Sequence, residues 1–147
     1  MRSHVLNNYK FIVEIGGMYV GGFSDISGLN SELTYEEYAE GGLNDYVHRF
    51  PSRKKSGHIT LKRGVTISSF LWDWYNDTKI GHVELLSGTI IVQNRYGVPM
   101  QWYNIYDAFP VKWVGPELNA NQAGVAFESI ELAHGGFQSM MNRIMKK

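Results

Sequence analysis

The stretch YKFIVEIGGMYVGGF, residues 9–23, decides the fold class, because apolar side chains recur at every second position until a glycine pair interrupts the pattern. This period of two predicts a strand over Tyr9–Ile15. Gly16-Gly17 then predicts a tight hairpin turn, and Met18–Phe23 predicts the antiparallel partner strand. The alternating sets are Phe11, Val13 and Ile15 against Lys10, Ile12 and Glu14.

Outward from this hairpin, short segments with the composition of strands recur along most of the chain, separated by polar or glycine-containing turns such as Ser87-Gly88. Many short strands at such spacing predict an antiparallel β-barrel or sandwich, so the expected fold class is mainly β. The expected strands are Ser31–Tyr38, Tyr46–Phe50, Gly57–Lys62, His82–Leu86, Thr89–Asn94, Met100–Asp107, Val111–Val114 and Val125–Ala133.

The region from Glu40 to Ser56 is poorly patterned for a core. Ala39–Asn44 (AEGGLN) has the composition of a flexible break, and Pro51–Ser56 has that of a basic, proline-containing connector. Glycine, proline and charged residues favour exposed backbone over a packed strand. Residues 40–56 are therefore expected to include a long, exposed excursion from the barrel.

Residues 66–78 change to the helical period and predict one packed α-helix. The side-chain oxygens of Thr66 or Ser68 are expected to cap its start. The residues on its aromatic and apolar face are Phe70, Leu71, Trp74, Tyr75 and Thr78.

A single domain is expected over residues 1–147, with its body at about 8–137 and a C-terminal tail at 138–147. The spacing of apolar residues over Phe137–Lys147 favours a short amphipathic helix. The predicted structural core is Phe11, Val13, Leu71, Trp74, Tyr75, Trp102, Trp113, Ile130 and Leu132.

Charge and cysteine content exclude several classes of protein. The chain has 14 lysines and arginines against 14 aspartates and glutamates, so its formal net charge is zero. This balance favours association and argues against nucleic acid, whose binding domains are usually basic. The absence of cysteine excludes disulfides and thiolate metal sites. Residues 1–8 lack the apolar stretch of a signal peptide, so synthesis in the cytoplasm is expected.

No motif for catalysis or for a cofactor is recognised. The glycines of residues 16–22 lack the spacing and the following helix of a dinucleotide loop. No serine lies in a nucleophile-elbow pattern. None of the five histidines has the helical i, i+4 spacing of a zinc pair. We therefore expect a protein that is not an enzyme and that binds no cofactor and no metal.

Charged side chains are segregated by sign between residues 32 and 63. In one interpretation, adjacent strands pair these charges across their own hairpin. In the other, the two runs are complementary poles that meet head to tail between copies of the chain. The acidic run is Glu32, Glu36, Glu37, Glu40 and Asp45. The basic run is Arg49, Arg53, Lys54, Lys55, Lys62 and Arg63.

Seven segments, taken in order, are more specific than any of them alone. They are FIVEI (11–15), GFSDISGL (22–29), ITLKRGV (59–65), FLWDWYND (70–77), AFPVKW (108–113), GPEL (115–118) and IELAHGG (130–136). The set resembles the tail tube proteins of contractile phages and, equally, the inner-tube proteins of phage-like contractile injection systems. The resemblance extends from about Asn8 to Phe137, and Gln138–Lys147 runs past the family's common core.

That resemblance implies a structural subunit that assembles as stacked hexameric rings into a hollow conduit, with no catalytic residues. The implied partners are further copies of the chain, a sheath protein around the tube, baseplate, tip and terminator proteins at its ends, and cargo in the lumen. No stable membrane insertion of the monomer is implied. The protein would belong to a phage virion tail or to a released, extracellular contractile particle. The expected inter-ring interface is Glu36, Glu37, Glu40, Asp45, Arg49, Arg53, Lys54 and Lys55.

The sequence is also compatible with two alternative functions. A tube initiator or terminator of the same machine would make one ring only, and the tail at 138–147 leaves this role possible. A small-ligand-binding β-barrel would instead be a monomer with an apolar pocket.

Overall fold

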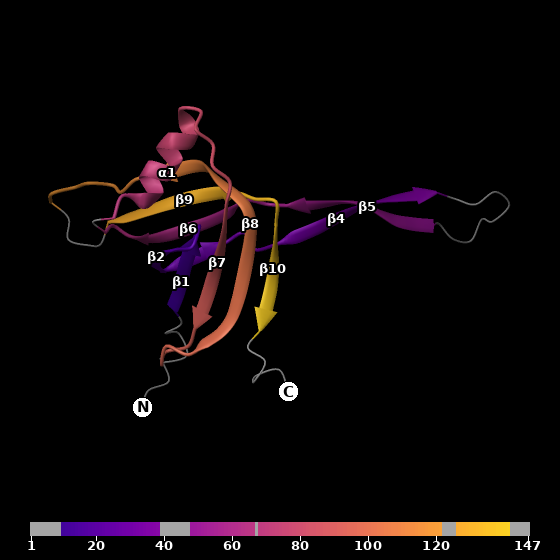
Figure 1. Cartoon of the computed structure of the whole chain (residues 1–147), viewed down its shortest axis with the longest axis horizontal. Helices are drawn as coiled ribbons and strands as arrows, with labels where there is room; N and C mark the ends of the chain where they lie inside the picture. The colour runs from indigo at the N-terminus through magenta and orange to yellow at the C-terminus, as the bar shows by residue number, and fades with distance from the viewer. Residues whose placement is uncertain (1–9, 39–47, 67, 122–125, 142–147) are drawn as a thin grey trace.

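The structure is a computed structural model that describes residues 10–38, 48–66, 68–121 and 126–141 (Figure 1). In chain order its elements are β1 Lys10–Ile15, β2 Met18–Phe23, β3 Asp25–Ser27, β4 Ser31–Tyr38, β5 His48–Ser56, β6 Ile59–Gly64, α1 Phe70–Lys79, β7 Leu86–Gln93, β8 Pro99–Val114, β9 Phe127–Ala133 and β10 Gly136–Met141. The predicted class, mainly antiparallel β with one packed helix, is confirmed. Within the described part, α1 has 10 residues and falls short of the roughly 20 needed to cross a bilayer.

Strand β8 is the centre of the sheet, whose strand order is β2-β1-β7-β8-β9-β6-β3. The first part of β8 lies between β7 and β10, and its last part, from Phe109 to Val114, pairs with β9. Asp107, with a positive φ of 53°, lies between these two parts. On β6, the guanidinium of Arg63 donates a 2.8 Å hydrogen bond to the carbonyl of Val20 on β2. The sheet therefore folds back toward its first strands as a barrel-like body (Figure 1).

The core fills the space between the folded halves of this sheet. Alternate residues of β6 and β9 point inward, as a strand's period of two requires, and bury Ile59 and Ile130 almost completely. Helix α1 covers one end of the barrel and adds Leu71 and Trp74. The cavity beside Trp74 measures about 10 Å³, roughly the space of one water molecule. This part of the interior has no room for the small ligand that one alternative requires.

A buried ion pair links β6 to β9. The Arg63 Nε donates to Glu128 Oε2 at 3.0 Å, and both side chains are more than nine-tenths buried. Trp113 Nε1 donates to the other carboxylate oxygen at 3.2 Å, while the Arg63 guanidinium lies over the ring of Phe23. Arg63, one of the basic run, is thus a structural residue of the interior, because Glu128 and Val20 partner it there.

Helix α1 begins at Phe70, four residues after the predicted start. The predicted capping is wrong. Thr66 Oγ1 accepts the N–H of Ser68, and Ser68 Oγ accepts the N–H of Phe70, so both hydroxyls form turns ahead of the helix. Ser69 is the N-cap, and its hydroxyl donates to Asp73 Oδ2 at 2.8 Å and makes no bond to the backbone of the first turn.

The predicted strand Ser31–Tyr38 is confirmed as β4, but the predicted connector Pro51–Ser56 is wrong. Those residues are the second half of β5, which among the described strands pairs only with β4, as a two-stranded sheet. Pro51 is tolerated because β5 is an edge strand and the ladder is irregular between Thr34 and Tyr35, the residue opposite Pro51. Residues 39–47, including the predicted break, lie outside the described part.

The predicted C-terminal helix is also wrong over its described part. Gly136–Met141 is strand β10, which continues the line of β9 along β8. The Phe137 ring lies 6.3 Å from that of Tyr103, which fixes the strand against the barrel. Residues 142–147 lie outside the described part.

Three further boundaries differ from the sequence prediction. His82–Leu85 is not a strand, and β7 instead runs from Leu86 through Ser87-Gly88, where a turn was predicted. The register of β7 against β8 shifts between Leu86 and Gly88, so the glycine there lies at a bulge. The two strands predicted between Met100 and Val114 are one bent strand, β8.

Candidate assembly surfaces

One layer of the barrel has an open strand edge at each end. Among the described strands, β2 pairs only with β1, and β10 pairs only with β8. Between them lie β1, β7 and the first part of β8. A strand edge carries unpaired N–H and C=O groups that can bind another strand. The two ends of this layer are therefore suited to pair with further copies of the chain.

The second surface is the arm, which we define as the β4–β5 sheet. Figure 1 shows this arm extending far from the barrel. Leu33 and Tyr35 on β4 are 58% and 56% exposed. Large apolar side chains on a projecting two-stranded sheet are poorly stabilised by the subunit itself, since such sheets are marginal alone in water. The arm is therefore a candidate surface for contact with another subunit.

The arm brings the acidic and basic runs side by side. In the ladder, Glu32 is opposite Lys55 and Glu37 is opposite Arg49. Opposite charges at directly facing strand positions stabilise a sheet. This register favours the interpretation in which the runs pair across their own hairpin. The same register places Arg53 and Lys54 opposite Thr34 and Leu33, which are not acidic, and Glu36 opposite Phe50. Glu40 and Asp45 lie outside the described residues.

The root of the arm is held by two histidines. His58 Nδ1 lies 2.5 Å from Glu131 Oε2, and His134 Nε2 donates to the carbonyl of Gly57 at 2.9 Å. Gly28 packs here as well, with φ of 92°, and a Cβ on it would clash with the His58 carbonyl oxygen. These contacts fix the direction in which the arm leaves the barrel. Within the described ranges, no group of acidic and histidine side chains is arranged to hold a metal ion.

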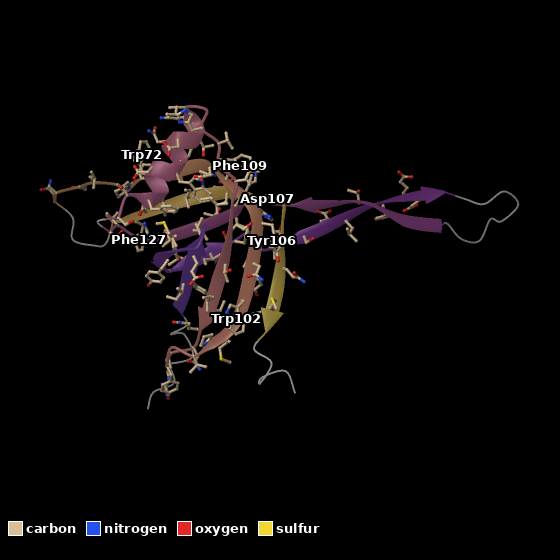
Figure 2. The ribbon with its side chains drawn as sticks, in the orientation of Figure 1. Trp72, Trp102, Tyr106, Asp107, Phe109 and Phe127 are labelled. Atoms are coloured by element: carbon tan, nitrogen blue, oxygen red, sulfur yellow. The ribbon has the colours of Figure 1, made fainter. Side chains whose placement is uncertain are left out.

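The third surface is the outer side of α1, which sequence reasoning did not single out. Trp72, labelled on α1 in Figure 2, is 38% exposed. Its ring makes an edge-on contact with that of Trp113, with 4.8 Å between the ring centres. Lys79 lies 5.6 Å from the centre of the Trp72 ring. The signal that could have found Trp72 was its position off the apolar face of the predicted helix.

The structure places the residues of the predicted core in three environments. Val13, Leu71, Trp74, Ile130 and Leu132 are buried in the central cluster. Phe11, Tyr75 and Trp113 are partly buried and pack against it. Trp102 is outside this cluster, so its assignment to the core is wrong: it lies on β8 opposite Ile91 and Met140, on the other face from the inward-pointing Ile105. The alternation of β8 decides this, because Trp102 and Ile105 differ by an odd number of positions.

The chain matches the profile of one protein family. The family profile described as "T4-like virus tail tube protein gp19" matches residues 7–138. Comparison with curated proteins returned no match.

Two solved structures cover nearly the whole chain. A chain in the sheath–tube complex of an extracellular contractile injection system (PVC, extended state) is 27% identical with a TM-score of 0.79, over 95% of this chain and 97% of that one. A chain in the PVC sheath/tube terminator is 29% identical with a TM-score of 0.77, over 90% of this chain and 94% of that one. Hcp1 from Flavobacterium johnsoniae, at 16% identity and a TM-score of 0.61 over 90% and 96%, shares the fold.

Proposed function

The chain belongs to the T4-like virus tail tube protein family and is a structural tube subunit, and from this premise we propose that it forms the repeating hexameric ring of a hollow tube. The family and the similar structures are tube proteins rather than enzymes. The family match, residues 7–138, includes the arm, helix α1 and the barrel as far as the third residue of β10, so all three surfaces fall wholly or partly within the tube fold.

The observation that carries the ring is the pair of open edges on one layer. If β10 of one copy lies beside β2 of the next, the contact is head to tail, and the same contact repeats around a circle. Closure satisfies both edges at once and leaves no strand edge of that layer open to further pairing. A chain with one open edge could form only dimers by this route.

The arm is the proposed contact between successive rings. It projects from the barrel, and its exposed Leu33 would be buried when a second ring lies beside it. Arg53 and Lys54 are directly opposite Thr34 and Leu33 rather than acidic residues, and we propose that they pair with acidic groups of another copy. The proposed interface also includes Glu36, Glu37, Glu40, Asp45, Arg49 and Lys55.

The remaining partners are proposed from the relatives. The two PVC complexes contain sheath, tube and terminator components, which supports a sheath around this tube and other proteins at its ends. We assign the chain to the body of the tube, with synthesis in the bacterial cytoplasm and function in a phage tail or an extracellular contractile particle. The terminator is the second candidate, because the terminator structure is 29% identical.

Electron microscopy of the purified chain tests the proposal. A main tube subunit should give hexameric rings and stacks of many rings, and a terminator should stop at single rings. Native mass spectrometry checks the number of copies in a ring. A stable monomer at high protein concentration would contradict both roles.

A further inference from the structure

The turn between β7 and β8 is built around one side chain. Asn94 Oδ1 accepts the N–H groups of Tyr96 and Val98 at 2.8 and 3.1 Å. The Asn94 N–H donates to the Val98 carbonyl at 3.0 Å, and the Gly97 N–H donates to the Asn94 carbonyl at 3.0 Å. Gly97 has φ of 81°, which glycine adopts at little cost. The tip of this hairpin is therefore preformed.

Arg95 and Tyr96 form a single unit at this tip. The Arg95 guanidinium lies over the Tyr96 ring, 4.4 Å from its centre, and donates a hydrogen bond to the phenol oxygen. Tyr96 is nevertheless 72% exposed. Tyrosine and arginine are enriched among residues that dominate binding energies. Because the two side chains already hold each other, burying them in a partner costs little further side-chain entropy.

A hollow of about 280 Å³ opens on the same two strands, toward their other ends. Glu14 is the only acidic residue in its lining, is exposed, and has no ionic partner among the described residues. Tyr106 is part of this lining, and Figure 2 shows it far from the turn, with Trp102 nearer the turn. The polar side chains of the lining belong to Glu14, Ser87, Thr89, Asn104 and Tyr106.

The tip cannot reach the hollow of its own chain. Ser87 in the hollow and Asn94 at the turn are joined by the extended strand β7, which separates them by about 23 Å at a rise of 3.3 Å per residue. Two features at opposite ends of the same strands come together only between copies displaced along the strand direction. Stacked rings whose strands run along the tube axis supply that displacement.

We propose that Arg95 and Tyr96 of one copy insert into the hollow of a copy in the adjacent ring, a contact that rests on the proposed tube function. The guanidinium meets the carboxylate of Glu14, and the phenol lies among the polar groups of Ser87 and Asn104. The charges are complementary, and a rigid aromatic in a concave site excludes water from the ion pair. Each ring has the tip toward one neighbour and the hollow toward the other, so the contact also gives the stack its polarity.

Cysteine cross-linking tests this contact directly, because the chain has no cysteine of its own. Tyr96→Cys and Ser87→Cys are combined in one chain, assembled and oxidised. A disulfide requires Cβ atoms about 4 Å apart, so the pair can close only between copies. We expect a ladder of covalent multimers on a non-reducing gel. Tyr96→Cys with Ser69→Cys, which lies at the start of α1, is the matched control and should give no ladder.

The outcomes separate this contact from the tube function itself. Stacked rings that show no ladder overturn the proposed contact and leave the tube function standing. A wild-type chain that forms no rings overturns the proposed tube function and therefore also the contact between rings. If the cysteine pair prevents stacking, variants that exchange the charges of Arg95 and Glu14 test the contact instead.

For the charge exchange, Arg95→Glu and Glu14→Arg are each expected to leave single rings and abolish stacks. The combined variant restores the opposite charges and should recover stacking. Equal tube lengths in wild type and in both single variants would overturn the contact, as would a double variant no better than the singles.

Discussion

Replacing Trp74 with alanine should remove the main anchor of the helix. Trp74 is 4% exposed, its ring lies 5.9 Å from that of Phe70, and its Nε1 donates to the Glu84 carbonyl at 3.3 Å. Large-to-small changes at buried tryptophans cost about 3–5 kcal/mol. For a chain of this size that loss lowers the Tm by about 10–15 °C.

The matched control is Trp72→Ala, two residues away in the same helix. Trp72 is 38% exposed and loses chiefly its contacts with Trp113 and Lys79, at a cost of about 1–2 kcal/mol. Thermal unfolding followed by circular dichroism, with all chains in the same assembly state, measures both variants. A Trp74→Ala variant whose Tm equals that of wild type, or is no lower than that of Trp72→Ala, would refute the role of Trp74 as the main anchor of the helix.

Three further predictions concern assembly. Exchanging the charges of the facing positions Glu32 and Lys55 should preserve tubes, because opposite charges still face each other; negative-stain images with clearly shorter tubes would contradict pairing within the arm. Reversing Arg53 and Lys54 to glutamate should abolish stacking while circular dichroism stays native, and normal tubes would exclude these residues from the inter-ring contact. Ending the chain after Gly135 removes β10 and should prevent ring closure in native mass spectrometry; intact hexamers would disprove its role as an edge.

Local patterns predicted the elements that depend on burial of one face. The alternation in Tyr9–Ile15 gives β1, and Ser31–Tyr38 coincides with β4. The helical spacing around Leu71 and Trp74 identified α1 and the residues that it buries. In each case the period of the apolar side chains places them on one face of the element. The element can therefore be predicted without knowing which part of the chain packs against that face.

The incorrect predictions involve segments whose partner is distant in the chain. The apolar spacing of Phe137, Met140 and Met141 suits a helix, but the free edge of β8 offers backbone hydrogen bonds and a contact with Tyr103. The composition of Pro51–Ser56 is typical of a connector, but pairing with β4 makes these residues part of a strand. Neither partner is visible in the local sequence.

The candidate contact surfaces divide in the same way. The sequence showed that the charges of residues 32–63 are segregated, and the ordered segments indicated the tube family. Only the tertiary structure placed Glu32 opposite Lys55 and brought Glu14 into a hollow with Ser87 and Asn104, toward the ends of β7 and β8 that are far from the Arg95–Tyr96 tip.

The sequence by itself determined that this chain is a β-rich structural subunit with one packed helix, because alternation, helical period and ordered motifs are local properties. The tertiary structure decided which charges are buried, which edges are open and where the arm points. Arg63 shows the reason: within the basic run it reads as a surface charge, yet it is buried against Glu128, 65 positions away, and only folding brings the two together.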